Sequence, residues 1–489
     1  MSLDDRRQLA TRRTVVFFGL LGALVAAVVL VLVLTAGPER PFAFSPGERA
    51  EFERAAAAGQ SHLLYAKSPG GAIATARRVD ALREPITRAA RAAGMDPGLI
   101  EGMVFLESAG RPDAVVEGDA ANAAGVSQIL PETGRNLLRM RIDLAASRRL
   151  TEQIVAAREQ GQMARVAALE RRRRRLDERF DPAKALAATG RYLAFAQPKF
   201  GRDDFAVASY HMGVGNLAEA IRAYVGPEEE RLARTLVEEE DLSYAQLYFD
   251  STPFVHRRAY RLLARLGDDS ATYLWRVLAA REIVRLYRSD PEELRRVNAL
   301  HINYGSGEAV LRPPGSTPVF ENAAALRRAR SQGVLLGIPN EPARRHFALD
   351  PDLPAGVRRR GGEPGLYTAL RPEALATLYY IADRVHAISR AREPLRVAAA
   401  VRDRDYEARL PKRELAGPRS YSLYTTGCSF DIKRRYEGGG QAEAFQAMLD
   451  RLEALNVIAW HVRGDVIRVT VSKRSSPLLP LLRGEELEG

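Results

Sequence analysis

Cysteine is nearly absent from this sequence, since Cys428 is the only one among 489 residues. A single cysteine excludes an intramolecular disulfide and a zinc site built from several thiolates. It leaves open whether the protein is exported, because a chain of this length can be stable without disulfides. The length predicts two or three domains, and 46% hydrophobic with 27% charged residues is typical of globular protein.

Charged residues are absent from Val15 to Thr35, and the uncharged stretch continues to Pro38. About 20 apolar residues are needed to cross a bilayer as a helix, so this stretch predicts a transmembrane segment. Its length and the lack of a lipobox cysteine after it favour an uncleaved anchor over a removed signal peptide. Four arginines precede it, which predicts an N-terminus in the cytoplasm and the bulk of the chain outside the inner membrane. We therefore expect residues 1–36 to be a cytoplasmic tip and a single-pass anchor.

Acidic residues are too few to balance the arginines, and the formal charge is 73 − 61 = +12. This balance favours anionic surfaces, which include nucleic acid, anionic lipid and acidic cell-wall polymers. A solvated, arginine-rich surface explains the same charge, including the dense run from Arg171 to Arg175. The predicted anchor opposes a nucleic-acid binder and no base-reading motif is present, so we expect no nucleic acid partner.

Hydrophobic periodicity divides the rest of the chain. Residues 45–300 have the three- and four-residue apolar spacing of helices. Within them, 143–180 is highly charged with a narrow apolar stripe, and Gly161 predicts a turn that makes this segment a helical hairpin, inserted into the domain. The proline- and glycine-rich segment 301–365 predicts a connector. Residues 366–475 mix the two periodicities, which predicts a C-terminal α+β domain behind the mainly α domain.

The α+β domain is expected to begin with a helix and to contain two strands, a second helix and a terminal hairpin. The first helix is expected to begin at Pro372, and the first strand at Leu395. The second strand is expected over Tyr421 to Ile432, the second helix over Ala442 to Leu455, and the hairpin around a turn at Gly464-Asp465.

A short helix carries the first candidate catalytic residue. Asp96 followed by Pro97 predicts its start, and Gly110 its end after Ser108. Glu107 falls in the last turn, on the inward-looking side, where burial and the helix dipole both raise a carboxyl pKa. Such a group stays protonated near neutral pH and can protonate a glycosidic oxygen. The alternative is a solvent-facing glutamate at a frayed helix end. The apolar stripe consists of Leu99, Ile100, Met103, Val104 and Leu106.

Three ordered motifs carry a family resemblance. They are Glu107-Ser108, the segment 124–134 (AGVSQILPETG) and the segment 208–215 (ASYHMGVG). Together they resemble the Glu-Ser pair, the "GLMQ…P-x-T" segment and the "AYN-x-G" segment of soluble lytic transglycosylases, glycoside hydrolase family 23. The resemblance covers about Asp80 to Tyr224 and implies a lysozyme-like fold.

The resemblance implies a role for each matching residue. Glu107 matches the catalytic acid/base, Ser108 its usual partner and Gln128 the glutamine that lines the cleft. Tyr210 matches the cleft tyrosine that supports the catalytic glutamate, and His211 replaces the family's asparagine beside the substrate.

The resemblance also implies a reaction without water. One carboxyl protonates the oxygen that leaves N-acetylmuramic acid (MurNAc), then helps the sugar's own 6-hydroxyl attack the anomeric carbon, which gives a 1,6-anhydro product. A lysozyme-type hydrolase would need a second carboxylate to position water, and Glu117 and Asp119 are the nearby candidates. One further departure from the family lies beside the sugar site, where Ser127 replaces its methionine.

The C-terminal region weakly resembles zinc D-alanyl-D-alanine carboxypeptidases, which trim peptidoglycan stem peptides. Arg402 matches the arginine that binds the peptide carboxylate, and Ser422, Gly427 and Asp431 match the middle motif S-x-H-x-x-G-x-A-x-D. His461 follows Trp460 as in the late E-x-W-H motif. We interpret Arg402, Asp431 and His461 as a possible stem-peptide groove.

The C-terminal region lacks residues that the carboxypeptidase reaction needs. Tyr424 replaces the first histidine ligand and Ile458 replaces the catalytic glutamate. The two ligands left, Asp431 and His461, are too few for a closed zinc site, so no metal is expected. A degenerate groove is the favoured interpretation, with an active metallopeptidase and a purely structural domain as the alternatives.

The sequence as a whole predicts a membrane-anchored, periplasmic lytic transglycosylase without a cofactor, acting on glycan strands and contacting stem peptides. The competing hypothesis is a non-catalytic, wall-binding scaffold. Glu107 separates the two hypotheses, because a scaffold has no need of an acid there.

Overall fold

The computed structural model describes residues 41–226, 229–267, 269–304, 306–410 and 421–485. The anchor predicted between Val15 and Thr35 lies outside these residues. Within the described ranges, no helix is long and apolar enough to cross a membrane.

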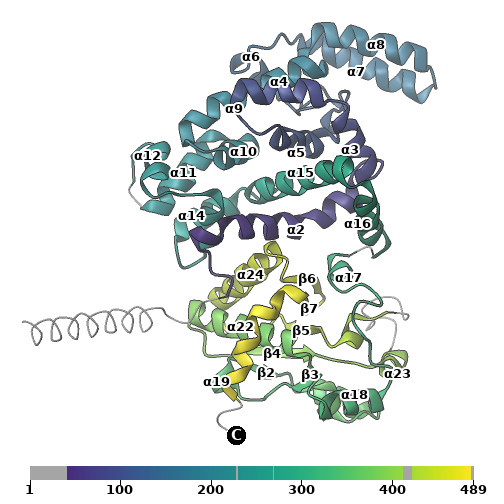
Figure 1. Cartoon of the computed structure of the whole chain (residues 1–489), viewed down its shortest axis with the longest axis vertical. Helices are drawn as coiled ribbons and strands as arrows, with labels where there is room; N and C mark the ends of the chain where they lie inside the picture. Colours follow the sequence, from purple (N-terminus) through teal and green to yellow (C-terminus); the bar gives the residue numbers. More distant parts are fainter. Residues whose placement is uncertain (1–40, 227–228, 268, 305, 411–420, 486–489) are drawn as a thin grey trace, which may run out of the picture. The chain divides into compact units, whose positions relative to one another are not determined.

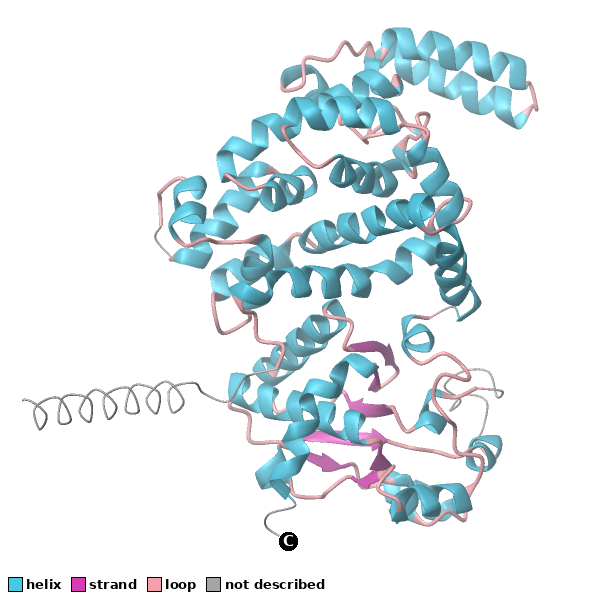
Figure 2. Cartoon of the chain, in the orientation of Figure 1, coloured by secondary structure: helices cyan, strands magenta, loops and turns pink. Residues whose placement is uncertain are grey.

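The helical region surrounds α5 (Pro97–Ser108), as Figures 1 and 2 show. This helix packs against α3 (Ala72–Asp80), α4 (Arg83–Ala93) and α15 (Tyr273–Ser289). Eight of its twelve residues are buried, which explains why its apolar stripe is wide. The predominance of helix before residue 304 confirms the periodicity read from the sequence.

Both ends of α5 form as the sequence predicts. Asp96 accepts a hydrogen bond from the Gly98 amide at 2.9 Å, and Pro97 occupies the first helical position. Ala109 and Gly110 follow Ser108 with left-handed φ values of 55° and 70°, and they turn the chain out of the helix.

The charged insertion is a helical hairpin, in agreement with the prediction. It consists of α7 (Leu144–Glu159) and α8 (Met163–Leu176), with Gly161 at a φ of +69° between them. Its two ends are joined by an antiparallel bridge between Ile142 and Asp177. The hairpin therefore enters and leaves the domain at one place.

The other α-helices of this region complete the domain around α5. They are α2 (Arg49–Lys67), α6 (Pro131–Asn136), α9 (Pro182–Phe200), α10 (Asp203–Met212), α11 (Val214–Val225), α12 (Ala233–Glu239), α13 (Tyr244–Asp250), α14 (Arg257–Arg265) and α16 (Pro291–Tyr304).

The C-terminal region is an α+β fold around a five-stranded sheet of order β2-β4-β5-β7-β6. The β2–β4 pair is parallel and the other pairs are antiparallel. Two long helices pack on each other, one contacting β7 and the other β6. The strands are β2 (Phe347–Leu349), β4 (Leu395–Ala399), β5 (Ser429–Lys433), β6 (Ile458–Arg463) and β7 (Val466–Val471), and the long helices are α22 (Pro372–Ser389) and α24 (Gly439–Ala454).

The interpretation of residues 301–365 as a connector is wrong. This segment supplies β2 to the main sheet, and its β1 (Leu336–Gly337) pairs with β3 (Ala369–Leu370). Strands of two or three residues are too short to show an alternating pattern, so prolines and glycines dominated the sequence signal. The remaining helices here and beyond are α17 (Gly307–Leu311), α18 (Ala323–Ser331), α19 (Pro342–Arg345), α20 (Asp352–Arg359), α21 (Pro364–Tyr367), α23 (Arg404–Ala408) and the 3-10 helix Lys473–Glu485.

The second predicted strand of this region is also shorter than expected. It begins at Ser429 and not at Tyr421, because Leu423–Thr426 forms a 3-10 turn. The Thr425 and Thr426 hydroxyls donate to backbone carbonyls three residues earlier, which favours a turn over a strand.

Candidate active site

Glu107 lies in the last turn of α5 and is half-buried. The Tyr273 hydroxyl, at the start of α15, donates to Glu107 Oε1 at 2.7 Å. Burial raises the pKa of Glu107 to about 7, while the Tyr273 hydrogen bond and the positive charge of Arg276 act in the opposite direction. The direction agrees with the one predicted from the position of Glu107 in its helix.

A carboxyl with a pKa of about 7 suits both halves of an acid/base reaction. Near neutral pH it is protonated often enough to donate a proton. Once it has donated, the Tyr273 hydroxyl and the Arg276 charge stabilise the carboxylate that remains.

The segment 124–129 forms a tight turn beside Glu107 and is held by two side chains from the predicted site. Ser108 Oγ donates to the Val126 carbonyl at 2.8 Å, and the Tyr210 hydroxyl donates to the Ser127 carbonyl at 2.8 Å. Tyr210 lies close enough to Glu107 for the carboxylate charge to add to the effect of burial in raising the tyrosine pKa. The hydroxyl that hydrogen-bonds to Glu107 is that of Tyr273.

Gln128 and Ser127 occupy the tip of this turn. Gln128 has a left-handed φ of 47°, and its Nε2 donates to the Gly125 carbonyl at 2.8 Å and to the Ala114 carbonyl at 3.3 Å. Ser127 is 2% exposed, and its hydroxyl has no hydrogen-bond partner among the described residues. The amide of Gln128 therefore braces the turn from within.

His211 is exposed and lies over the tyrosine that contacts Glu107. Its ring stacks on Tyr273 with centroids 5.0 Å apart, and its Nδ1 shares a 2.7 Å hydrogen bond with Ser270 Oγ. The structure thus brings together Glu107, Ser108, Gln128, Tyr210 and His211, the five residues predicted for this site.

Tyr273 and Arg276 were missed by the sequence reasoning. Tyr273 is 166 positions from Glu107 in the sequence, beyond the stretch covered by the motif resemblance. It opens a long amphipathic helix, and nothing in the local pattern distinguishes it from an ordinary core tyrosine.

The two carboxylates considered for a hydrolytic mechanism differ from Glu107. Asp119 is held by Arg148 at 2.8 and 3.0 Å and by the Ala121 amide, and these hydrogen bonds lower its pKa. Glu117 is exposed, in the 3-10 turn Val116–Gly118, with a left-handed φ of 52°. Asp119 is thus ion-paired with Arg148 of the hairpin.

A second polar cluster lies in the C-terminal region, around Tyr424. Its hydroxyl donates to Asp431 Oδ1 at 2.5 Å and accepts from Arg468 Nε at 3.0 Å. The Arg402 guanidinium lies 4.2 Å from the Tyr424 ring centroid and donates to Glu407 Oε1 at 3.2 Å. Tyr424, Asp431 and Arg468 are 1%, 7% and 2% exposed, so this cluster is closed to solvent.

The predicted groove residues are partly brought together. Asp431 and His461 both face Arg468 across the sheet, in the registers Asp431↔Arg468 and His461↔Arg468. His461 Nδ1 shares a 2.7 Å hydrogen bond with Glu308, a residue from the segment taken for a connector. Among the described residues, no group of three or more histidine, cysteine, aspartate or glutamate side chains could hold a metal ion.

A known protein family matches the segment that contains Glu107. Residues 84–232 match the family model of the transglycosylase SLT domain, so this segment is a lytic transglycosylase-like domain. At the family level this supports an enzyme that acts on peptidoglycan. No curated protein and no solved structure matches the chain. The match does not include the C-terminal region, so the resemblance of that region to carboxypeptidases stays a prediction.

Proposed function

We propose that this protein is a lytic transglycosylase that cleaves the β-1,4 bond between MurNAc and N-acetylglucosamine (GlcNAc) and forms a 1,6-anhydro-MurNAc end. The observation that supports it most directly is the environment of Glu107. This carboxyl is half-buried, has a pKa of about 7 and lies inside the SLT-matched segment.

The proposed reaction uses Glu107 twice. Its carboxyl first donates a proton to the glycosidic oxygen, the bond from that oxygen to the MurNAc anomeric carbon breaks, and GlcNAc leaves as an alcohol. The Glu107 carboxylate then takes the proton of the MurNAc 6-hydroxyl as that oxygen attacks the anomeric carbon. The carboxyl is regenerated, and the two steps balance without water.

The neighbourhood of Glu107 favours this route over hydrolysis. An inverting hydrolase needs a second carboxylate as a base, and a retaining one needs a carboxylate as a nucleophile about 5 Å away. Of the two candidates for that carboxylate, Asp119 is ion-paired with Arg148 and Glu117 is exposed. Tyr273 is the hydrogen-bonding neighbour of Glu107 instead.

We also propose that the chain works outside the cytoplasmic membrane, anchored by the apolar segment Val15–Thr35. The support is the sequence alone: an uncharged run of bilayer length preceded by arginines. Peptidoglycan, the substrate class of the SLT domain, lies on that side of the membrane.

The experiment that tests the reaction is mass spectrometry of products from purified peptidoglycan. The fragment from Pro41 onward is compared with Glu107→Gln, Glu117→Gln and Asp119→Asn. Anhydro-muropeptides from all but the Glu107 variant are expected. Reducing-end muropeptides would make the protein a hydrolase, and loss of product in the Glu117 or Asp119 variant would then identify the second carboxylate.

The same experiment tests the non-catalytic alternative. If neither the wild type nor Glu107→Gln releases product while both still bind sedimented peptidoglycan, the protein is a wall-binding scaffold and the enzymatic proposal fails.

A further inference from the structure

Arg179 is a fully buried arginine between the charged hairpin and the turn beside Glu107. It is 0% exposed, as is its partner Asp177. An unpaired charge buried in this way is strongly unfavourable, so such an arginine persists only where its surroundings satisfy it.

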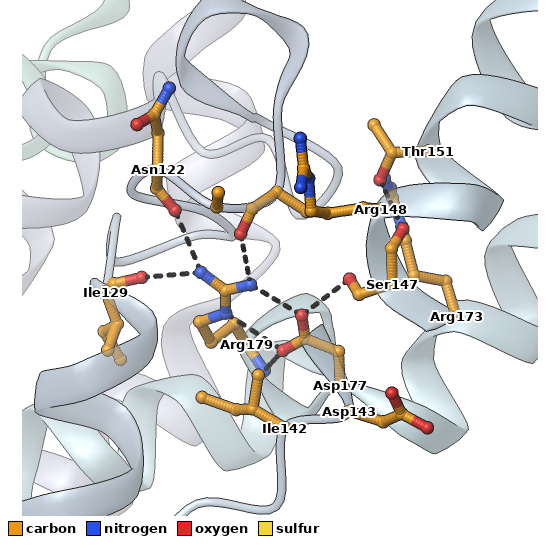
Figure 3. Close-up of polar contacts among 12 residues, drawn as sticks. Asn122, Ile129, Ile142, Asp143, Ser147, Arg148, Thr151, Arg173, Asp177 and Arg179 are labelled. Carbon is orange, nitrogen blue, oxygen red and sulfur yellow. Dashed lines mark hydrogen bonds and ion pairs between the residues drawn. The ribbon is translucent and has the colours of Figure 1, made fainter. Parts of the chain in front are cut away.

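The guanidinium of Arg179 uses all five of its N–H groups, as Figure 3 shows. Nε and Nη2 donate to the Asp177 carboxylate at 3.0 and 2.7 Å. The other three N–H groups donate to backbone carbonyls: Ala120 at 2.7 Å, Asn122 at 2.9 Å and Ile129 at 3.2 Å. These three carbonyls bracket the turn that contains Ser127 and Gln128.

The backbone of Arg179 touches the same turn. A Cβ added to Gly125, which has a φ of +78°, would lie 1.8 Å from the Arg179 carbonyl oxygen. The turn is thus fixed to residue 179 through both backbone packing and side-chain hydrogen bonds. On its other side the turn accepts the hydrogen bonds of Ser108 and Tyr210.

Asp177 connects this arrangement to the hairpin. Its Oδ2 accepts from Ser147 Oγ on α7 at 2.7 Å as well as from Arg179. Arg173, another buried arginine on α8, donates to Thr151 Oγ1 at 2.9 Å and lies 3.7 Å from the Phe180 ring centroid. Both arginines lie at the base of the hairpin, but of the two only Arg179 donates hydrogen bonds to the 120–129 segment (Figure 3).

We propose that Arg179 is a positioning residue for glycan binding: its guanidinium fixes the 120–129 segment, and through it Ser127 and Gln128, against the Glu107 site. The inference rests on the proposed function for its substrate, a peptidoglycan glycan strand. Its action is indirect, because Arg179 is buried and acts through the backbone of the turn.

The test compares three variants of the fragment from Pro41 onward. Removing Arg179 alone would leave the Asp177 charge unpaired and could unfold the domain, so the main variant is the pair Asp177→Asn with Arg179→Met. Arg179→Lys retains the charge but lacks the planar five-donor geometry. Arg173→Met is the matched control, since it removes a buried guanidinium from the base of the same hairpin without removing a hydrogen bond to the turn.

Two readouts separate positioning from stability. The first is hydrogen exchange of the backbone amides in 120–129, compared with those of α5. The second is the steady-state KM and kcat for soluble, uncrosslinked glycan strands. In the paired variant we expect exchange in the turn to accelerate while α5 stays protected, and KM to rise about tenfold, within the hundredfold loss that a misplaced contact can cause.

The shape of the pH profile should not change in the paired variant, because Tyr273 and Arg276 still surround Glu107. Arg179→Lys should fall between the wild type and the paired variant. Arg173→Met should lower the melting temperature but leave KM within about twofold of the wild type, because its side-chain hydrogen bond ends on Thr151 of the hairpin.

The proposal is overturned if the paired variant keeps wild-type exchange in the turn and wild-type KM, or if Arg173→Met raises KM equally. If the wild type itself releases no product, the proposed function fails. In that case the exchange rates still decide whether Arg179 fixes the turn.

Discussion

The carboxylates of the two polar clusters, Asp431 and Glu107, differ in their hydrogen bonds and in their exposure to solvent. Asp431, in the C-terminal cluster, accepts a hydrogen bond from Tyr424 and lies 3.7 Å from the Arg468 guanidinium, closed off from solvent. Glu107 accepts a hydrogen bond from Tyr273 and remains partly open to solvent. The first carboxylate is neutralised by its neighbours in the fold. The second is partly buried, which raises its pKa and leaves its proton available to a substrate.

The Glu107 site is therefore suited to chemistry, and the Tyr424 cluster to structural support. A general acid must lose and regain a proton easily, which requires incomplete pairing. A buried, hydrogen-bonded network rigidifies a core and is closed to a substrate. Substitutions around Glu107 should therefore change turnover, whereas substitutions around Tyr424 should change stability.

The largest effect is expected from Glu107→Gln. The change removes the proton donor while keeping the oxygen that accepts from Tyr273, so turnover of glycan strands should fall about 10³-fold. Product release measured by chromatography of muropeptides checks this. Glu117→Gln is the matched control, and an equal loss there would remove the distinction drawn for Glu107.

The same substitution should stabilise the protein in alkaline buffer. Because the pKa of Glu107 is raised to about 7 in the folded state, the wild type loses folding stability as pH rises from about 4.5 to 7. Below that window both states are protonated and the two proteins should melt alike. Above it, Glu107→Gln should be more stable by up to about 3 kcal/mol, since each pKa unit is worth about 1.4 kcal/mol. Melting at pH 4 and pH 8 measures the difference, and identical shifts at both values would contradict the raised pKa.

The hydrogen bond from Tyr273 should tune the working pH. In Tyr273→Phe the carboxylate loses a donor that lowers its pKa, so the alkaline limb of kcat/KM should move above pH 7. Activity should fall about tenfold, because the carboxylate left after proton donation is less stabilised. A limb that stays in place would show that Tyr273 does not set the proton affinity of Glu107.

In the C-terminal cluster the corresponding change should affect stability alone. Tyr424→Phe deletes the hydroxyl that joins Asp431 to Arg468, and leaving buried polar groups unsatisfied costs about 1–3 kcal/mol. Denaturant unfolding should detect this loss while kcat and KM on glycan strands stay within twofold. A rise in KM for strands carrying stem peptides, but not for bare strands, would instead support the stem-peptide groove.

The smallest effect is expected from zinc or a chelator. The tyrosine at the first ligand position and the guanidinium beside Asp431 oppose a cation there. Adding zinc or EDTA should leave the melting temperature unchanged within about one degree. A zinc-dependent rise would require the cluster to open and would revive the metallopeptidase alternative.

Sequence reasoning succeeded where the signal was local. The limits of α5 follow from Asp96, Pro97 and the turn after Ser108, and the hairpin follows from Gly161 between two amphipathic stretches. The ordered motifs located the cleft turn and Glu107 together. The helix limits and the hairpin turn depend on residues only a few positions apart, which is the range over which capping and periodicity act, whereas the motifs were found by their resemblance to a family.

The features missed depend on distant pairs or very short elements. Tyr273 reaches Glu107 from a separate helix, and no spacing rule connects them. Arg179 follows the arginine run 171–175, in which Arg173 is also buried, and it is itself wholly buried because three carbonyls and Asp177 converge on it. The strand β2 has three residues and owes its place to pairing with β4.

The separation of Glu107 and Tyr273 also has a consequence for folding. The hairpin contacts are local and close a short loop, whereas the Glu107–Tyr273 contact joins residues 166 positions apart. Because the entropy of loop closure must be overcome before a distant contact forms, local elements tend to form first. During refolding, glycan cleavage should therefore recover later than helical circular dichroism, so that the enzymatic activity reports the completion of the fold.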